Sequence, residues 1–140
     1  MSVFETERLV MRPWREDDAE NLYKYASDPE VGPAAGWPVH TSVEDSLRVL
    51  REVLIEENTW AVTIKASDEP VGSIGVFRTD APNGNGAPEI GYWIGKPFWG
   101  CGYIPEAVRA LIDRCFNDGA ESVWCSHFAG NDKSRRVIEK

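Results

Sequence analysis

No stretch of this 140-residue sequence is apolar over the length that a membrane crossing requires. A membrane helix needs about 20 consecutive apolar residues, and Arg, Lys, Asp or Glu interrupts every hydrophobic segment here. The amino terminus, MSVFETERL, reaches Glu5 and Glu7 too early for the apolar region of a signal peptide. We therefore expect a cytoplasmic protein that does not act at a membrane.

Cysteine is also scarce, and positively charged residues are fewer than negatively charged ones. Cys101, Cys115 and Cys125 form neither an even disulfide set nor the CxxC pair of a zinc site, so we expect reduced thiols and no metal. The 15 Lys and Arg against 23 Asp and Glu leave a net charge of −8, which argues against a nucleic-acid partner. An acidic protein suits a cationic substrate such as an amine, but acidity also serves solubility alone.

The hydrophobic pattern predicts one domain over residues 1–140, without repeats or low-complexity segments. Period-2 alternation predicts strands at 8–14, 59–65, 71–77, 89–95 and 122–128. Helical spacing predicts a helix with Ala19, Leu22, Tyr23 and Ala26 on one face, and further helices at 41–57, 105–118 and 131–140. This βααβββαβα order predicts an α/β (α+β) fold whose mixed sheet has helices on both sides.

Local signals mark the ends of these predicted helices. Thr41 and Glu44 have the spacing of a capping box, and Pro105 suits the first turn of a helix. Gly119 stands where a C-terminal glycine is expected. Asn131 and Asp132 are suitable N-caps for the last predicted helix.

The segment WGCGY, residues 99–103, lies between a predicted strand and a predicted helix. Unpaired amides and the helix dipole make such a helix start an anion site, and Gly100 and Gly102 would let a phosphate approach closely. The alternative is that these glycines only make the turn. Neither common phosphate motif is present: Tyr103 follows Gly102 where a P-loop has lysine, and Pro105 replaces the third glycine of a dinucleotide fingerprint.

Residues 89–116, EIGYWIGKPFWGCGYIPEAVRALIDRCF, closely resemble the acetyl-CoA-binding segment of the GCN5-related N-acetyltransferases (GNAT). The chain looks most like the RimJ/RimL-type branch, which acetylates ribosomal-protein N-termini and other amines. That branch often reads Trp-Gly-x-Gly-Tyr-x-x-Glu-Ala, which residues 99–107 match. TERLVMRPWREDDAENLY, GWPVHTSVEDS and NDKSRRVIEK resemble further segments of the branch, so the resemblance covers nearly the whole chain.

The resemblance implies a mostly antiparallel GNAT-like sheet flanked by helices, with acetyl-CoA as co-substrate. In the family the sheet continues past the position of Lys140, so we expect a C-terminally truncated domain. The implied pyrophosphate loop comprises Trp99, Gly100, Cys101, Gly102, Tyr103 and Ile104. Trp93 and Ile94 would pair with the pantetheine arm, and Asn131 would contact the cofactor unless it is a plain helix cap.

Transfer to an amine requires a group that removes its proton. Glu89 is the candidate base by resemblance to relatives, and the alternative is a surface carboxylate. Ser126 is a candidate donor to the departing thiolate. Trp37 and Tyr25 are candidates for the wall of the acceptor pocket.

These residues favour an N-acetyltransferase that acts by direct attack of a primary amine in a ternary complex. One alternative is a non-catalytic acyl-CoA-binding or regulatory domain that keeps the loop but lacks a working base. Another is a chain that forms a homodimer through an exposed edge strand.

Overall fold

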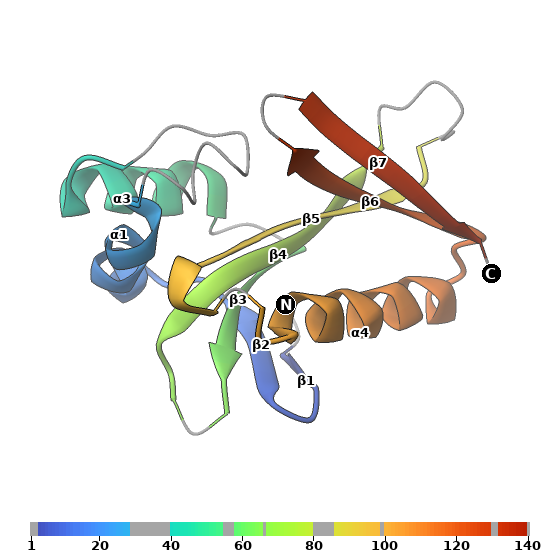
Figure 1. The fold of residues 1–140 in the computed structure, drawn as a ribbon, viewed down its shortest axis with the longest axis horizontal. Helices are drawn as coiled ribbons and strands as arrows, with labels where there is room; N and C mark the ends of the chain where they lie inside the picture. The colour runs from blue at the N-terminus through green and yellow to red at the C-terminus, as the bar shows by residue number, and fades with distance from the viewer. Residues whose placement is uncertain are drawn as a thin grey trace.

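The computed structural model describes residues 3–28, 40–54, 58–65, 67–79, 86–98, 100–129 and 132–139, without the side chains of Val53, 126–129 and 132–139. Its strands form one sheet of seven, in the spatial order β1 to β7 (Figure 1). They are β1 Phe4–Glu5, β2 Leu9–Pro13, β3 Thr59–Ile64, β4 Pro70–Arg78, β5 Pro88–Ile94, β6 Ser122–Ala129 and β7 Asp132–Glu139. The helices are α1 Ala19–Ala26, α3 Val43–Val49 with a π-helical extension Leu50–Leu54, and α4 Tyr103–Asn117. Short 3-10 turns lie at Glu16–Asp18 and Lys96–Phe98.

All neighbouring strands of the sheet are antiparallel except β5 and β6. A parallel pair cannot be joined by a tight turn and needs a long crossover, which α4 supplies. Pro70 and Pro88 each stand at the first position of a strand, where a missing N–H is tolerated. The predicted mixed, mostly antiparallel sheet is therefore confirmed.

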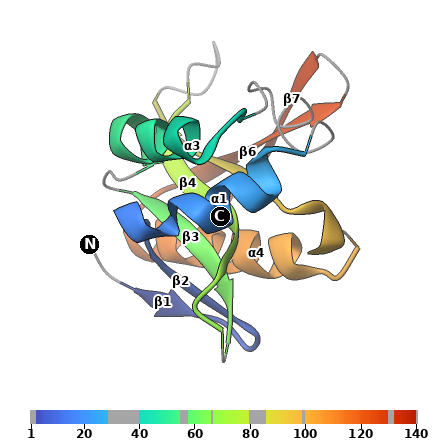
Figure 2. The same ribbon diagram turned by 90° about the vertical axis from the view of Figure 1, so that its left-hand side faces the viewer.

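Helices cover both faces of the sheet (Figures 1 and 2). One core cluster joins Ala107 and Leu111 of α4 to the strand residues Leu9, Met11, Trp60, Val62, Ile74, Ile90 and Val123. A second cluster, on the other face, joins Ala19, Leu22 and Ala26 of α1 and Leu50 and Leu54 of the π-helical extension to Trp14 and to Ala61 of β3. Trp60, Ala61 and Val62 thus alternate between the two cores, as successive residues of a strand do.

The prediction of a helix at 131–140 is wrong, because residues 132–139 form β7. β7 pairs with β6 in an antiparallel ladder of eight residue pairs, from Ser122↔Glu139 to Ala129↔Asp132. Two residues, Gly130 and Asn131, separate the strands, and a Gly-Asn pair is a typical hairpin connection. Pairing with β6 in this hairpin overrides the helix-capping signal of the preceding residues. β1 was not predicted either.

Two details of the predicted helices also need correction. Tyr25 rather than Tyr23 is buried on the inner face of α1. The cap of α3 is Ser42 rather than Thr41: Ser42 Oγ accepts from the Asp45 amide at 3.0 Å, and the Asp45 carboxylate accepts from the Thr41 amide at 3.2 Å. Ser42 takes the cap because its extended backbone directly precedes the first helical residue.

The predicted end of α4 is confirmed. Gly119 has φ +107° and donates to the Phe116 carbonyl, while Ala120 donates to the Cys115 carbonyl, each at 3.0 Å. These two bonds make a Schellman motif, which satisfies carbonyls at the helix end.

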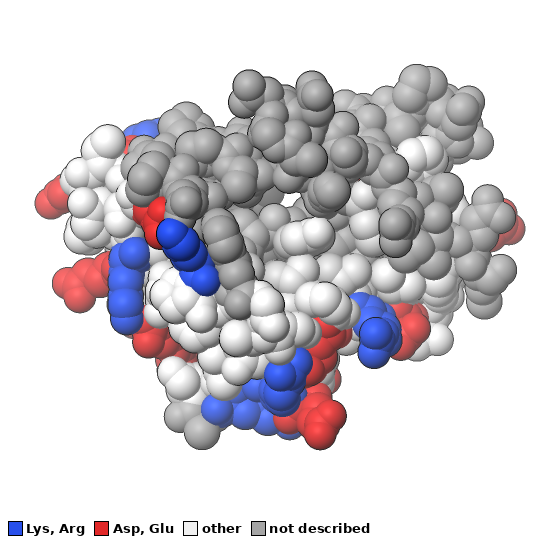
Figure 3. Space-filling model, viewed as in Figure 1, with Lys and Arg blue, Asp and Glu red and all other residues white. Residues whose placement is uncertain are grey.

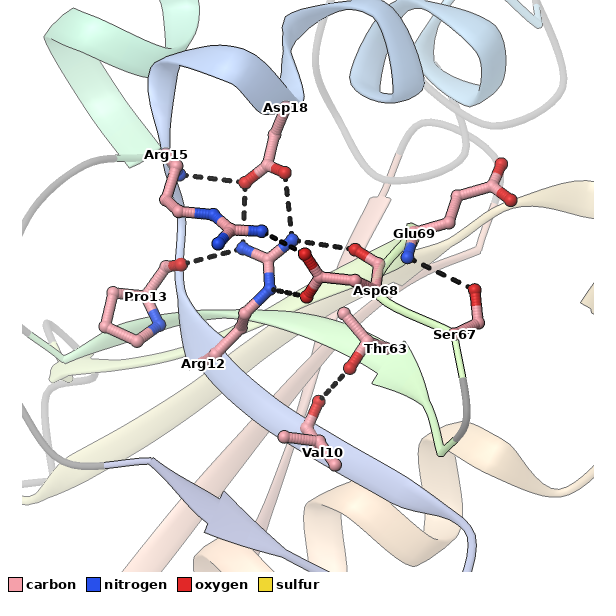
Figure 4. A network of polar contacts seen from close by, with 9 residues as sticks. All are labelled: Val10, Arg12, Pro13, Arg15, Asp18, Thr63, Ser67, Asp68 and Glu69. Carbon is pink, nitrogen blue, oxygen red and sulfur yellow. Dashed lines mark hydrogen bonds and ion pairs between the residues drawn. The ribbon is translucent and has the colours of Figure 1, made fainter.

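Several described charged side chains form ion pairs between elements, such as Arg8–Glu106, Lys24–Glu69 and Arg51–Glu16. On the face shown in Figure 3, the described Lys and Arg residues lie beside Asp or Glu. One such pairing, centred on Arg12 of β2, is buried (Figure 4).

Arg12 uses its whole guanidinium group to join three segments of the chain. It donates to both carboxylate oxygens of Asp18 at 2.9 Å, to Asp68 Oδ1 at 2.8 Å, and to the carbonyls of Pro13 and Asp68. Burial lowers the pKa of Arg12, but the bonds to Asp18 and Asp68 raise it above its ordinary value. The network therefore holds β2, the start of α1 and the β3–β4 turn together.

The two carboxylates of this network differ in burial, so their replacements should differ in cost. The Asp18 side chain is 5% exposed and that of Asp68 is 68% exposed. Asp18→Ala leaves Arg12 without its buried counter-charge and should lower the free energy of unfolding by about 3–5 kcal/mol. Asp68→Ala removes an exposed partner and should cost about 1 kcal/mol or less. Chemical denaturation of both variants measures this, and equal costs would contradict it.

Candidate functional site

β5 and β6 diverge after a short contact (Figure 1). They are paired at Glu89↔Trp124 and Ile90↔Cys125, whereas β5 pairs with β4 at seven positions up to Ile94. The last four residues of β5 thus extend beyond the described β5–β6 ladder. The Gly95 amide donates to the Val71 carbonyl at 2.7 Å, and the turn Lys96–Phe98 then leads to the glycines that precede α4.

Both glycines of the loop adopt a left-handed backbone conformation. Gly100 has φ +77° and Gly102 has φ +81°, which side chains with a Cβ adopt only with strain. Gly102 is the N-cap of α4, and its carbonyl accepts from the Glu106 amide at 3.3 Å. The turn alone therefore favours glycine at both positions.

The surroundings of Gly100 leave room for more than a turn. Apart from its chain neighbours, no described residue has an atom within 4 Å of a Cβ added at Gly100, and Gly100, Cys101 and Gly102 are exposed. The amides of Tyr103 and Ile104 belong to the first turn of α4, where helical acceptors are lacking. The arrangement presents N–H groups and the positive end of a 15-residue helix next to open space.

The loop is held from the side by the turn between β1 and β2. Arg8 donates through Nε to Glu106 Oε1 at 2.7 Å and through its amide to Glu106 Oε2 at 3.0 Å. Its Nη1 donates to the Cys101 carbonyl at 3.0 Å, and its guanidinium lies 4.6 Å from the centre of the Tyr103 ring. Thr6 Oγ1 also donates to Glu106. We call this set of contacts among Thr6, Arg8, Cys101, Tyr103 and Glu106 the Arg8–Glu106 latch.

The contacts of the latch favour the charged forms of Arg8 and Glu106. The hydrogen bond to Glu106 raises the pKa of Arg8 above its ordinary value. Burial pushes the pKa of Glu106 upward, but the bonds from Thr6 and Arg8 outweigh burial and bring it below its usual range. The latch was not predicted from the sequence, because Arg8 and Glu106 are 98 residues apart. The only sequence signals near it were the TERL segment and the Glu106-Ala107 pair.

Glu89 lies where β5 and β6 begin to diverge. Its side chain is fully buried, and Thr79 Oγ1 donates to Glu89 Oε1 at 2.6 Å. The alternative of a surface carboxylate is therefore wrong. Glu89, Gly91 and Trp93 alternate with Ile90 and share the sheet face that α1 and α3 cover, because Ile90 packs with α4 and Trp93 with Trp14.

Residues 8–140 match the family model described as the acetyltransferase (GNAT) domain. The chain belongs to the GNAT acetyltransferase family. It is 36% identical over 121 residues to the protein named uncharacterized N-acetyltransferase p20 of Bacillus licheniformis, covering 83% of this chain and 67% of p20.

Two further comparisons add detail. The chain is 40% identical over 70 residues to YdaF of Bacillus subtilis, a protein named provisionally as a ribosomal N-acetyltransferase. The matched residues make up 49% of this chain and 37% of YdaF. The crystal structure of a GNAT-family acetyltransferase from Bacillus anthracis has a TM-score of 0.73 at 21% identity, over 89% of this chain and 73% of that one. The fold is therefore that of the GNAT family. Within the described residues, no helix is long and apolar enough to span a membrane.

The structure brings part of the predicted GNAT site together. Gly100, Cys101, Gly102, Tyr103 and Ile104 form one continuous loop and helix start. Trp93 and Ile94 end β5, and the Trp93 ring stacks on Trp14 at 6.3 Å between ring centres. Ser126 follows the last β6 residue paired with β5, but its side chain is not among those described.

The other predicted site residues are less favourably placed or lie outside the description. Tyr25 is 5% exposed, contacts the Phe98 ring and donates to Glu69 at 3.0 Å, and burial raises its pKa. It is a core residue, so its role at an acceptor pocket stays a prediction that burial does not favour. Trp37, Trp99 and Asn131 lie outside the described residues. The alternative that Asn131 caps a helix is wrong, because β7 follows it.

The Thr79–Glu89 bond should be worth more than an otherwise similar bond to a neutral acceptor. Thr63 provides the control, because it is also buried and donates to the Val10 carbonyl at 2.8 Å. Thr79→Val should cost about 1.5–3 kcal/mol of unfolding free energy, and Thr63→Val about 0.5–1.5 kcal/mol.

A double-mutant cycle in urea tests the cause of that difference. Glu89→Gln replaces the carboxyl group with a neutral amide and should shrink the cost of Thr79→Val toward that of Thr63→Val. If Thr79→Val costs the same in the Glu89→Gln background as in the unchanged chain, the carboxylate charge has no part in the difference.

Proposed function

We propose that this chain transfers the acetyl group of acetyl-CoA to a primary amine, either a protein N-terminus or a small-molecule amine, by direct attack in a ternary complex. One arrangement carries the proposal. β5 extends beyond its pairing with β6 and leads to an open glycine loop at the start of α4, and the buried Glu89 lies where β5 and β6 separate. GNAT membership implies acetyl-CoA as the co-substrate. The YdaF match and the WGCGY motif support the RimJ/RimL-like branch.

The residues of the loop fit a pyrophosphate. The missing Cβ of Gly100 leaves open space, and the Gly102, Tyr103 and Ile104 amides stand at the positive end of α4. The loop from Trp99 to Ile104 would hold the pyrophosphate, Trp93 and Ile94 would border the pantetheine arm, and Asn131 would add a contact. Acetyl-CoA would supply an acyl group already activated as a thioester. No metal takes part in this scheme.

Glu89 is the group we assign to proton removal. An amine that attacks a carbonyl must lose a proton, and a positioned base typically accelerates such a step by about 10²–10⁴-fold. The backbone amide of Ile94 would polarise the carbonyl as an oxyanion-hole donor does, since the amides of its neighbours in β5 face β4. Ser126 would donate a hydrogen bond to the departing thiolate, and Trp37 would border the acceptor.

The second candidate function is a non-catalytic acyl-CoA-binding domain. It shares the loop and differs only in lacking a working base and acceptor site. The open position at Gly100 supports both functions, whereas the buried, hydrogen-bonded Glu89 favours the enzyme.

Gly100→Asn separates a loop that only turns from a loop that binds phosphate. Asparagine adopts the left-handed conformation more readily than other side chains, and its Cβ would meet nothing at this position. The variant should therefore fold, yet its Kd for acetyl-CoA in isothermal titration should rise at least about tenfold, because the side chain occupies the space of the pyrophosphate.

Gly119→Asn is the matched control at the other end of α4. It also has positive φ and open space, and it should bind acetyl-CoA like the unchanged chain. The unchanged chain should also bind dephospho-CoA, but it should not bind adenosine. Equal affinities of the two asparagine variants would show that Gly100 serves only the turn.

Glu89→Gln distinguishes the enzyme from the binding domain. It keeps the side-chain volume but cannot accept the proton, so kcat should fall by about 10²–10⁴-fold while the Kd for acetyl-CoA is kept. Release of CoA thiol with a panel of peptide and small amines gives the rate. Glu52→Gln, an exposed carboxylate paired with Arg48, is the control. Unchanged turnover in Glu89→Gln would exclude Glu89 as the base.

A further inference from the structure

We propose that Arg8 is a positioning residue for the pyrophosphate loop: it orients the Cys101–Gly102 peptide and neutralises Glu106 beside the anion. This inference rests on the proposed acetyl-CoA function. It concerns a residue in the turn between β1 and β2, outside the segment that carries the family resemblance of the loop.

The first part of the argument concerns the peptide plane. Arg8 Nη1 binds the Cys101 carbonyl at 3.0 Å. In a planar trans peptide the C=O and the following N–H point in opposite directions. By holding the Cys101 carbonyl toward its guanidinium, Arg8 directs the Gly102 N–H away from the β1–β2 turn. Without this bond, the flexible backbone of Gly102 would let the peptide rotate and present a carbonyl oxygen to the phosphates.

The second part concerns charge. Glu106 lies in the first turn of α4, where a carboxylate favours the helix dipole but repels an incoming pyrophosphate. Arg8 binds Glu106 with both its amide and its Nε and so offsets that negative charge. Thr6 donates to the same carboxylate.

The third part explains why Arg8 holds one position although its side chain is 45% exposed. The guanidinium lies over the Tyr103 ring, and a Cβ at Gly102 would stand 3.3 Å from Nη2. Gly102 thus serves both the backbone conformation and the close approach of Arg8. Contacts with the carboxylate, the carbonyl and the ring fix the guanidinium from three sides.

Binding of two ligands by Arg8→Gln tests the proposal. Acetyl-CoA contains the pyrophosphate, whereas S-acetyl-pantetheine has the same thioester and arm without it. Arg8→Gln should raise the Kd and KM for acetyl-CoA at least about tenfold, and leave kcat and the Kd for S-acetyl-pantetheine within about twofold. Arg48→Gln, which removes another exposed arginine with carboxylate partners, should change neither ligand.

Two further variants separate the two parts of the role. Arg8→Lys keeps the charge but lacks the planar fork that reaches Glu106 and Cys101 together, so it should regain only part of the affinity. Arg8→Gln with Glu106→Gln removes the unbalanced carboxylate and should also regain part. In NMR spectra of the free protein, the Gly102 amide resonance should shift in Arg8→Lys and not in Arg48→Gln.

The outcomes are distinguishable. Failure of the folded, unchanged chain to bind acetyl-CoA would overturn the proposed function and this inference with it. Normal acetyl-CoA affinity in Arg8→Gln would overturn the inference alone. Equal loss of both ligands in Arg8→Gln would mean that Arg8 only supports the fold. If Arg8→Gln does not fold, Arg8→Lys and the Gly102 resonance decide.

Discussion

The parallel pairing of β5 with β6 is the constraint on which the rest of the structure depends. Antiparallel neighbours can follow one another through short turns, but a parallel pair requires the chain to return over the sheet, and α4 makes that return. The return places the start of α4 after the end of β5, so the loop glycines, the helix dipole and the last residues of β5 belong to one continuous segment. The same pairing is short, and its end at Ile90 brings Glu89 to the point where the strands separate.

Arg12 and Glu89 are buried ionisable residues, and both form hydrogen bonds inside the protein. Arg12 is surrounded by carboxylates and carbonyls that use its five donors, and it holds together three segments on the α1 side. Glu89 is fully buried on a strand and accepts a hydrogen bond from the Thr79 hydroxyl. Enzymes often use buried carboxylates to exchange protons, and this is the chemical basis for assigning the role of base to Glu89.

Much of this could be predicted from local pattern. Strands at 59–65, 71–77 and 89–95 appear within about two residues of their expected limits, since alternation and flanking Gly and Pro act locally. The strand at 132–139 was missed because Asn131 and Asp132 also suit a helix start, although the Gly130-Asn131 pair is a hairpin signal. Burial of Tyr25 in place of Tyr23 depends on which face of α1 meets Gly95 and Phe98, a contact between distant segments.

The sequence by itself determined the glycine loop, the helix that follows it and the family to which they belong, because backbone conformation and helix starts depend on neighbouring residues. Only the tertiary structure decided that Glu89 is buried, that Arg12 joins Asp18 to Asp68, and that Arg8 meets Glu106 across 98 residues of chain. These features depend on which strands lie side by side. Side-chain patterns along one segment carry no information about a partner that the fold brings from another.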